Sequence, residues 1–113
     1  MMLKPLELKE LRQMASDFEL MNAYLVPFEH EKRVKDDGSP AIWYRVVFDI
    51  AVGNNVQHIV LSTSRKTLRR FANTESALEF VESELHESNF EKISLLRHVD
   101  NKFNQPLDAL ERN

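Results

Sequence analysis

The sequence has no cysteine, and its 113 residues include only two glycines and four prolines. Without cysteine the chain cannot form a disulfide, a thiolate zinc site or a thiol nucleophile. The two glycines, Gly38 and Gly53, are isolated and cannot make a glycine-rich phosphate-binding loop. The scarcity of glycine and proline also excludes collagen-like and low-complexity proteins.

Long apolar runs are missing as well. The longest uncharged stretch, residues 50–64, contains a turn and several polar side chains. It is shorter than the ~20 apolar residues of a membrane helix. The N-terminus has its first charge at Lys4 and shows no apolar run of signal-peptide length. We therefore expect a soluble, cytoplasmic protein without a membrane segment.

The common motifs of enzymes are absent too. The sequence contains neither a G-x-S-x-G nucleophile elbow nor an H-E-x-x-H zinc motif. Its four histidines, at positions 30, 58, 86 and 98, are scattered, and their spacing predicts no metal site. We predict no catalytic activity, no metal ion and no cofactor.

The overall composition is that of an ordinary globular protein. Hydrophobic residues make up 42% and charged residues 29% of the chain, which is typical of a soluble single domain. We assign residues 1–99 to one domain and residues 100–113 to a polar tail that is either docked or disordered. The formal net charge is −3, so no overall positive field attracts nucleic acid.

The clearest predicted element is an antiparallel hairpin over residues 41–63. Its first strand alternates an apolar or aromatic set with a mixed set, which predicts one face in the core and one partly in solvent. Residues 53–55, Gly-Asn-Asn, tolerate the positive φ of a tight turn. The core set is Ile42, Tyr44, Val46, Phe48 and Ile50, and we place Trp43, Val47, Ile59 and Leu61 on the opposite face.

Two elements are predicted before the hairpin. The helical spacing of apolar residues over residues 3–18 predicts a helix with Pro5 in its first turn. Residues 23–30 favour a strand, but Pro27 restricts it to a sheet edge. The charged residues 31–40 are expected to form a loop.

After the hairpin, residues 68–71 are a candidate short strand. Asn73 or Thr74 then caps a helix that extends to about residue 87, and residues 90–98 form a last strand. This order predicts an α+β fold, in which an antiparallel sheet of three to five strands has a helix packed on one face. The N-terminal helix, or a partner, would cover the other face.

Glutamates occupy the outer surface of the helix predicted at residues 74–87. Such a surface is either a solvated helix face or a docking site for a basic partner, such as a nucleic-acid-binding protein. The glutamates concerned are Glu75, Glu79, Glu82 and Glu84, with Glu87 beyond them.

Trp43, the only tryptophan, lies on the mixed face of its strand. We expect it to pack under the N-terminal helix. If that face is open instead, Trp43 together with Val47 and Ile59 would form an interaction patch.

A basic segment at residues 65–70 carries four positive charges within six residues. Arginines grip phosphates through two hydrogen bonds, and an adjacent aromatic ring can stack on a base. The opposing interpretation is a solvated loop whose charges pair with the acidic helix. The residues concerned are Arg65, Lys66, Arg69 and Arg70, followed by Phe71.

The stretch TLRRFANTESALEFV, residues 67–81, resembles a pattern in small accessory proteins of plasmids and integrative conjugative elements. In that pattern a hairpin is followed by an aromatic residue and a capped helix that starts with an alanine-leucine pair. The resemblance, which spans residues 42–97, implies a role in plasmid replication or maintenance without defining an activity. The matching residues are Arg69, Phe71, Thr74, Ala77 and Leu78.

Two hypotheses for function follow. The first is a non-enzymatic accessory or inhibitor protein of a mobile genetic element, whose acidic helix and Trp43 bind a basic protein partner. The alternative is a nucleic-acid-binding accessory protein, for plasmid maintenance or regulation, that uses the basic segment. A homodimer would double that basic surface.

Overall fold

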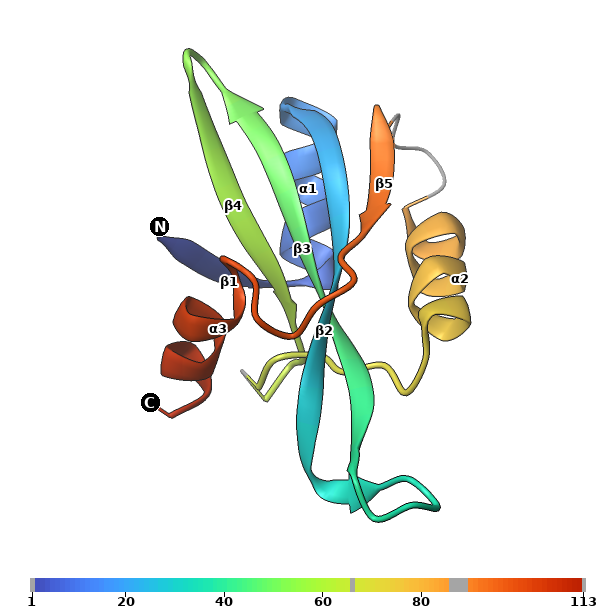
Figure 1. Ribbon diagram of the computed structural model, residues 1–113. Coiled ribbons are helices and arrows are strands. Elements are labelled where there is room, and N and C mark those ends of the chain that lie inside the picture. Colours follow the sequence, from blue (N-terminus) through green and yellow to red (C-terminus); the bar gives the residue numbers. More distant parts are fainter. Residues whose placement is uncertain (1, 66, 86–89, 113) are drawn as a thin grey trace.

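The computed structural model describes residues 2–65, 67–85 and 90–112. Within these residues the chain forms five strands and three helices (Figure 1). The strands are β1 (Leu3–Glu7), β2 (Glu19–Val34), β3 (Pro40–Val52), β4 (Asn55–Ser62) and β5 (Lys92–Leu95). The helices are α1 (Leu8–Asp17), α2 (Thr74–Glu84) and α3 (Asn104–Glu111).

The five described strands form one mixed sheet in the order β1-β4-β3-β2-β5. The three inner strands are antiparallel to one another, whereas β1 runs parallel to β4 and β5 runs parallel to β2. The α+β class is therefore confirmed, and the prediction of an antiparallel sheet is wrong. Alternation of apolar residues reports which side of a strand is buried but not the strand's direction, so the parallel edges leave no such signal.

The helix predicted over residues 3–18 is wrong in its first part, because β1 precedes α1. Pro5 stands in an edge strand, where a missing N–H is tolerated. At the start of α1 the carboxylate of Glu10 accepts a hydrogen bond from the N–H of Glu7 (3.1 Å). Leu11 is fully buried, so the helical spacing seen in the sequence holds from there to the end of α1.

Strand β2 is longer and more central than the edge strand predicted at residues 23–30. It lies between β3 and β5, but β5 pairs only with residues 22–25. Pro27 therefore stands where β3 alone flanks β2, an edge position that proline tolerates. Of the loop predicted at residues 31–40, residues 31–34 and Pro40 are strand, whereas residues 35–39 form the connection that was predicted. The β2–β3 hairpin projects past the other strands as an arm, residues 29–43, shown in teal at the lower end of Figure 1.

The hairpin predicted at residues 41–63 is confirmed by the antiparallel pairing of β3 and β4. Their register sets Phe48 directly opposite Ile59, and opposite residues share a face of the sheet. Ile59 and Leu61 therefore lie on the same face as Phe48, and their assignment to the opposite face is wrong.

The segments after the hairpin are partly as predicted. Residues 68–71 make two isolated bridges rather than a strand. Helix α2 begins after Asn73, whose side chain accepts a hydrogen bond from the N–H of Ser76 (2.8 Å), as the predicted cap requires. The predicted end of this helix, residues 86–89, lies outside the described residues, and β5 is shorter than the strand predicted at 90–98.

Two hydrophobic cores lie on opposite faces of the sheet. Helices α1 and α2 cover the first core, whereas α3 and the segment before it cover the second (Figure 1). The expectation that the N-terminal helix covers the second face is wrong. The C-terminal segment covers it instead, because Phe103 and Leu107 supply fully buried apolar side chains. The second core consists of Leu3, Val26, Val47, Val60, Leu68, Phe103 and Leu107.

Candidate functional site

The outer side of α2 carries the glutamates that the sequence indicated. Because the other side packs into the first core, Glu75, Glu79 and Glu82 are exposed, and none has a partner in the described part of the chain. Glu84 differs, because it forms an ion pair with Arg12. Leu78, which is 37% exposed, lies among the three free glutamates. We call these four residues, Glu75, Leu78, Glu79 and Glu82, the acidic face.

Trp43 is not part of this surface. Its indole ring lies on the arm, 4.8 Å from the ring of His30, and the Arg33 guanidinium is 6.0 Å from the ring centroid. The expectation that Trp43 packs under the N-terminal helix is therefore wrong. The alternative patch with Val47 and Ile59 is also wrong, because both of those side chains are fully buried and lie on opposite faces.

The predicted basic segment does not form one continuous surface among the described residues. Arg65 is exposed on the turn after β4, and Lys66 lies outside the described residues. The Arg69 guanidinium lies 4.7 Å from the ring centroid of Phe80 on α2. The Phe71 ring packs on the same phenylalanine, with 5.3 Å between centroids, so it is a core contact rather than a free stacking platform.

Arg70 is neutralised within the fold. Its guanidinium bonds to both carboxylate oxygens of Glu31 (2.8 Å each) and to Glu111 (2.6 Å). Partial burial lowers the pKa of Arg70, but the hydrogen bonds that it donates to Glu111 and Glu31, together with the charges of these two carboxylates, outweigh burial and raise the pKa above its ordinary value. Arg70 is therefore a cross-link between the arm, residues 68–71 and α3, and it is not free to bind phosphate.

The sequence did not indicate a second arginine, which is buried beside Arg70. Arg45 on β3 is fully buried and bonds to three residues of α3: to Asn104 (2.9 Å), to Asp108 (3.1 Å) and to Glu111. Its Nε atom has no partner in the described residues. The spacing of the three α3 residues, four and then three, places them on one helix side, and this was the only signal available in the sequence.

A second polar cluster links the three inner strands. The Tyr24 hydroxyl donates to one carboxylate oxygen of Asp49 (2.8 Å), and His58 Nδ1 lies 2.6 Å from the other. Burial raises the pKa of the Tyr24 hydroxyl, and the hydrogen bond to Asp49 and the charge of Asp49 raise it further. The Phe103 ring covers the cluster, with its centroid 5.1 Å from that of the Tyr24 ring and 6.3 Å from that of the His58 ring. The cluster therefore forms part of the surface against which the C-terminal segment packs.

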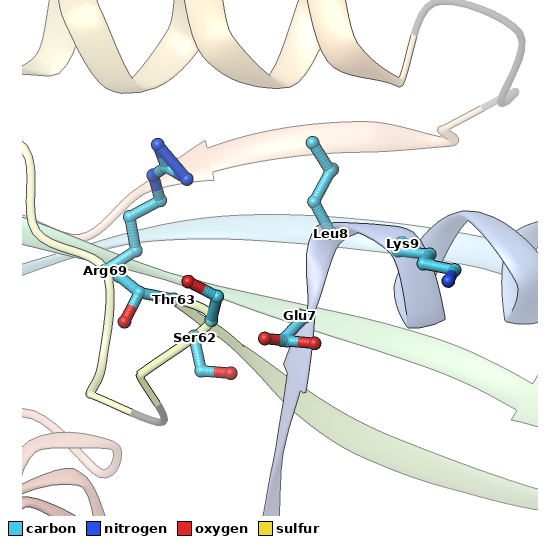
Figure 2. Close-up of a pocket in the computed structure, with 7 residues that line it drawn as sticks. Glu7, Leu8, Lys9, Ser62, Thr63 and Arg69 are labelled. Atoms are coloured by element: carbon cyan, nitrogen blue, oxygen red, sulfur yellow. The ribbon is translucent and has the colours of Figure 1, made fainter.

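An open pocket of about 400 Å³ lies where β1 and β4 end and α1 begins (Figure 2). It is lined by residues 7–9 and 62–64 and by Arg69. Leu8 and Arg69 extend to the same side of the sheet, toward α2 (Figure 2). The predicted basic segment thus contributes one arginine to a pocket that the sequence did not indicate.

Among the described residues, no cluster of histidine and acidic side chains is arranged to hold a metal ion. No described helix is long and apolar enough to span a membrane. In the comparisons with known proteins, no family model, no curated protein and no solved structure matches this chain. The resemblance to accessory proteins of mobile elements therefore stays a prediction.

Proposed function

We propose that this protein is a non-enzymatic binding protein whose acidic face contacts a basic surface on a partner protein. One observation supports the proposal: Glu75, Glu79 and Glu82 are exposed and have no described counter-charge. Residues three and four positions apart are neighbours on a helix, so Glu75 and Glu82 flank the partly exposed Leu78, and Glu79 follows it directly in the sequence. The charges would orient the partner and speed its association, and Leu78 would supply apolar contact.

The energetics of the free protein also favour a partner. Glu75 and Glu79 are four residues apart, and Glu79 and Glu82 are three apart, so each pair of like charges destabilises α2 slightly. A basic surface would relieve this repulsion. Glu84, by contrast, already has its counter-charge in Arg12, and we leave it out of the binding surface.

The proposed biological setting is a mobile genetic element, where the protein would act as an accessory or inhibitor. This part of the proposal rests on the resemblance of residues 67–81 to small plasmid and conjugative-element proteins.

The test is capture of partners from the native host with a photo-crosslinking amino acid in place of Leu78. The acidic face is reversed in the variant Glu75→Lys, Glu79→Lys and Glu82→Lys. The matched control, Glu19→Lys, Glu29→Lys and Glu91→Lys, changes the net charge equally at exposed sites away from α2.

We expect the unmodified chain and the control to capture the same basic protein, and the α2 variant to lose it. Capture should weaken as salt rises, because exposed charges are screened beyond about 8 Å at physiological ionic strength. Equal capture by both triple variants, or no crosslinked protein from position 78, would refute the proposal.

Nucleic-acid binding by residues 65–70 ranks second. With Arg70 held by two carboxylates, only Arg65 and Arg69 among the described basic residues of this segment lack an acidic partner. Each phosphate contact releases about one counterion, so two contacts give weak binding at physiological salt. A titration with single-stranded and duplex DNA and RNA at low salt tests this: binding abolished by Arg65→Ala with Arg69→Ala would promote it, and no binding would remove it.

A further inference from the structure

The pocket at the start of α1 lies at the carboxyl ends of two parallel strands. Glu7 and Ser62 are the last paired residues of β1 and β4, and the two segments then diverge, β1 into α1 and β4 into the turn at residues 64–65. Such divergence leaves a space outside the strand ends, where sheets with parallel strands commonly bind ligands. The volume, about 400 Å³, is that of a small-molecule site.

Arg69 supplies a fixed positive charge at this pocket. Its backbone N–H donates to the carbonyl of Leu61 (2.9 Å), and its guanidinium rests 4.7 Å from the ring centroid of Phe80. In the described part of the chain no carboxylate pairs with it, although the next residue, Arg70, is bonded to two. A half-buried guanidinium held on an aromatic face and lacking a counter-anion is a preorganised anion-binding group.

The other lining residues define the kind of anion. Lys9 also lines the pocket and adds positive charge at its rim, with its ammonium directed away from Arg69 (Figure 2). Glu7 contributes a carboxylate that disfavours polyanions. The hydroxyl of Ser64 makes no hydrogen bond to another described residue, so it is free to donate to a ligand oxygen. Leu8 lines the pocket with an apolar side chain that extends to the same side of the sheet as Arg69 (Figure 2). The site therefore suits one anionic group attached to a short apolar part.

The capped start of α1 is not the anion-binding element. Glu7 and Glu10 form a capping box there, so the chain's own carboxylates already occupy the helix end.

We propose that this pocket binds a small organic anion, a carboxylate or a phosphate monoester, through the guanidinium of Arg69. The pocket includes no residue of the acidic face, so this inference stands independently of the proposed protein partner.

The experiment is a titration of the full chain with butyrate, butyl phosphate and butanol, followed by calorimetry and by the NMR shifts of residues 62–64 and 69. The three probes share one apolar part and differ in charge. We expect millimolar binding of one or both anions, with the stronger identifying the headgroup, and no binding of butanol.

Three variants locate the charge responsible. Arg69→Gln should weaken anion binding about tenfold or more, and Lys9→Gln, an exposed change that leaves the core untouched, about threefold. The matched control Arg65→Gln removes the same charge from the same segment outside the pocket and should bind as the unmodified chain does. Binding of butanol equal to that of the anions, no shift with any probe, or equal binding by the Arg69 and Arg65 variants would overturn the proposal.

Discussion

The face of the sheet under α1 and α2 is covered by apolar side chains. The face under α3 also contains a buried arginine, a buried aspartate, and a histidine and a tyrosine that are partly buried. On the first face, Phe48 and Ile59 are fully buried among apolar neighbours. On the second, Arg45 is as completely buried and Asp49 is 6% exposed. A hydrophobic core tolerates any apolar residue of about the right size, but a buried charge needs particular partners. The second face is therefore the more specific of the two in the partners that it requires.

The largest expected effect is on the apolar face. Replacing Phe48 with alanine should lower the free energy of unfolding by about 3–5 kcal/mol, because it removes a fully buried ring from a packed core. Urea denaturation followed by circular dichroism measures this. The control Val56→Ala, at a side chain 48% exposed, should change stability by about 0.5 kcal/mol or less; a similar loss in both variants would contradict the assignment of the core.

On the polar face, the expected effect comes mainly from leaving Arg45 without counter-charges, while Arg70 loses one of its two carboxylates. The double variant Asp108→Asn and Glu111→Gln should cost about 2–3 kcal/mol, somewhat less than a fully buried pair because the two carboxylates reach solvent. Adding Arg45→Met to this variant should restore part of the loss, since an apolar side chain there needs no partner. If Arg45→Met destabilises the double variant further in urea unfolding, the hydrogen bonds between Arg45 and α3, and not the cost of the buried charge, control the docking of α3.

Tyr24→Phe removes the hydroxyl that donates to Asp49 (2.8 Å) and accepts a longer hydrogen bond from Asn22 (3.5 Å). Loss of the donor to Asp49 should cost about 1–2 kcal/mol at neutral pH. Because the pKa of Tyr24 is raised in the folded chain, its contribution is complete below the ordinary tyrosine pKa of about 10 and is lost as pH rises through the folded value. In unfolding curves measured from pH 8 to pH 11, the difference in the free energy of unfolding between the two proteins should therefore begin to narrow above about pH 10. A difference that stays constant over this range would argue against the hydrogen bond.

The smallest expected effect is at the exposed ion pair between α1 and α2. A double-mutant cycle with Arg12→Ala and Glu84→Ala should give a coupling energy of about 0.5 kcal/mol that falls in high salt, because both side chains are partly solvated. A coupling above about 2 kcal/mol would mean that this pair, and not the core beneath it, holds α2 in place.

Several elements could be predicted because their signals are local. The alternation in residues 42–50, the turn at Gly53 and the cap at Asn73 each depend on neighbours in the chain, and all three recur in the structure. The outward position of Glu75, Glu79 and Glu82 follows from helical periodicity in the same way.

The first residues of the chain show where local signals mislead. The segment at residues 3–7 has helical spacing and a proline suited to a first turn, yet it pairs with β4. The available edge of β4 lies far along the chain, and the hydrogen bonds it offers outweigh the local preference.

What the sequence by itself determined is the α+β class, the central hairpin, α2 and its acidic outer side. Only the tertiary structure decided the parallel edge strands, the packing of α3 on the second face, and the different partners of two adjacent arginines. Arg70 meets Glu31 and Glu111, whereas Arg69 meets Phe80 and an open pocket. Charge and burial at these positions depend on partners tens of residues away, and one-dimensional periodicity carries no information about which distant segments meet.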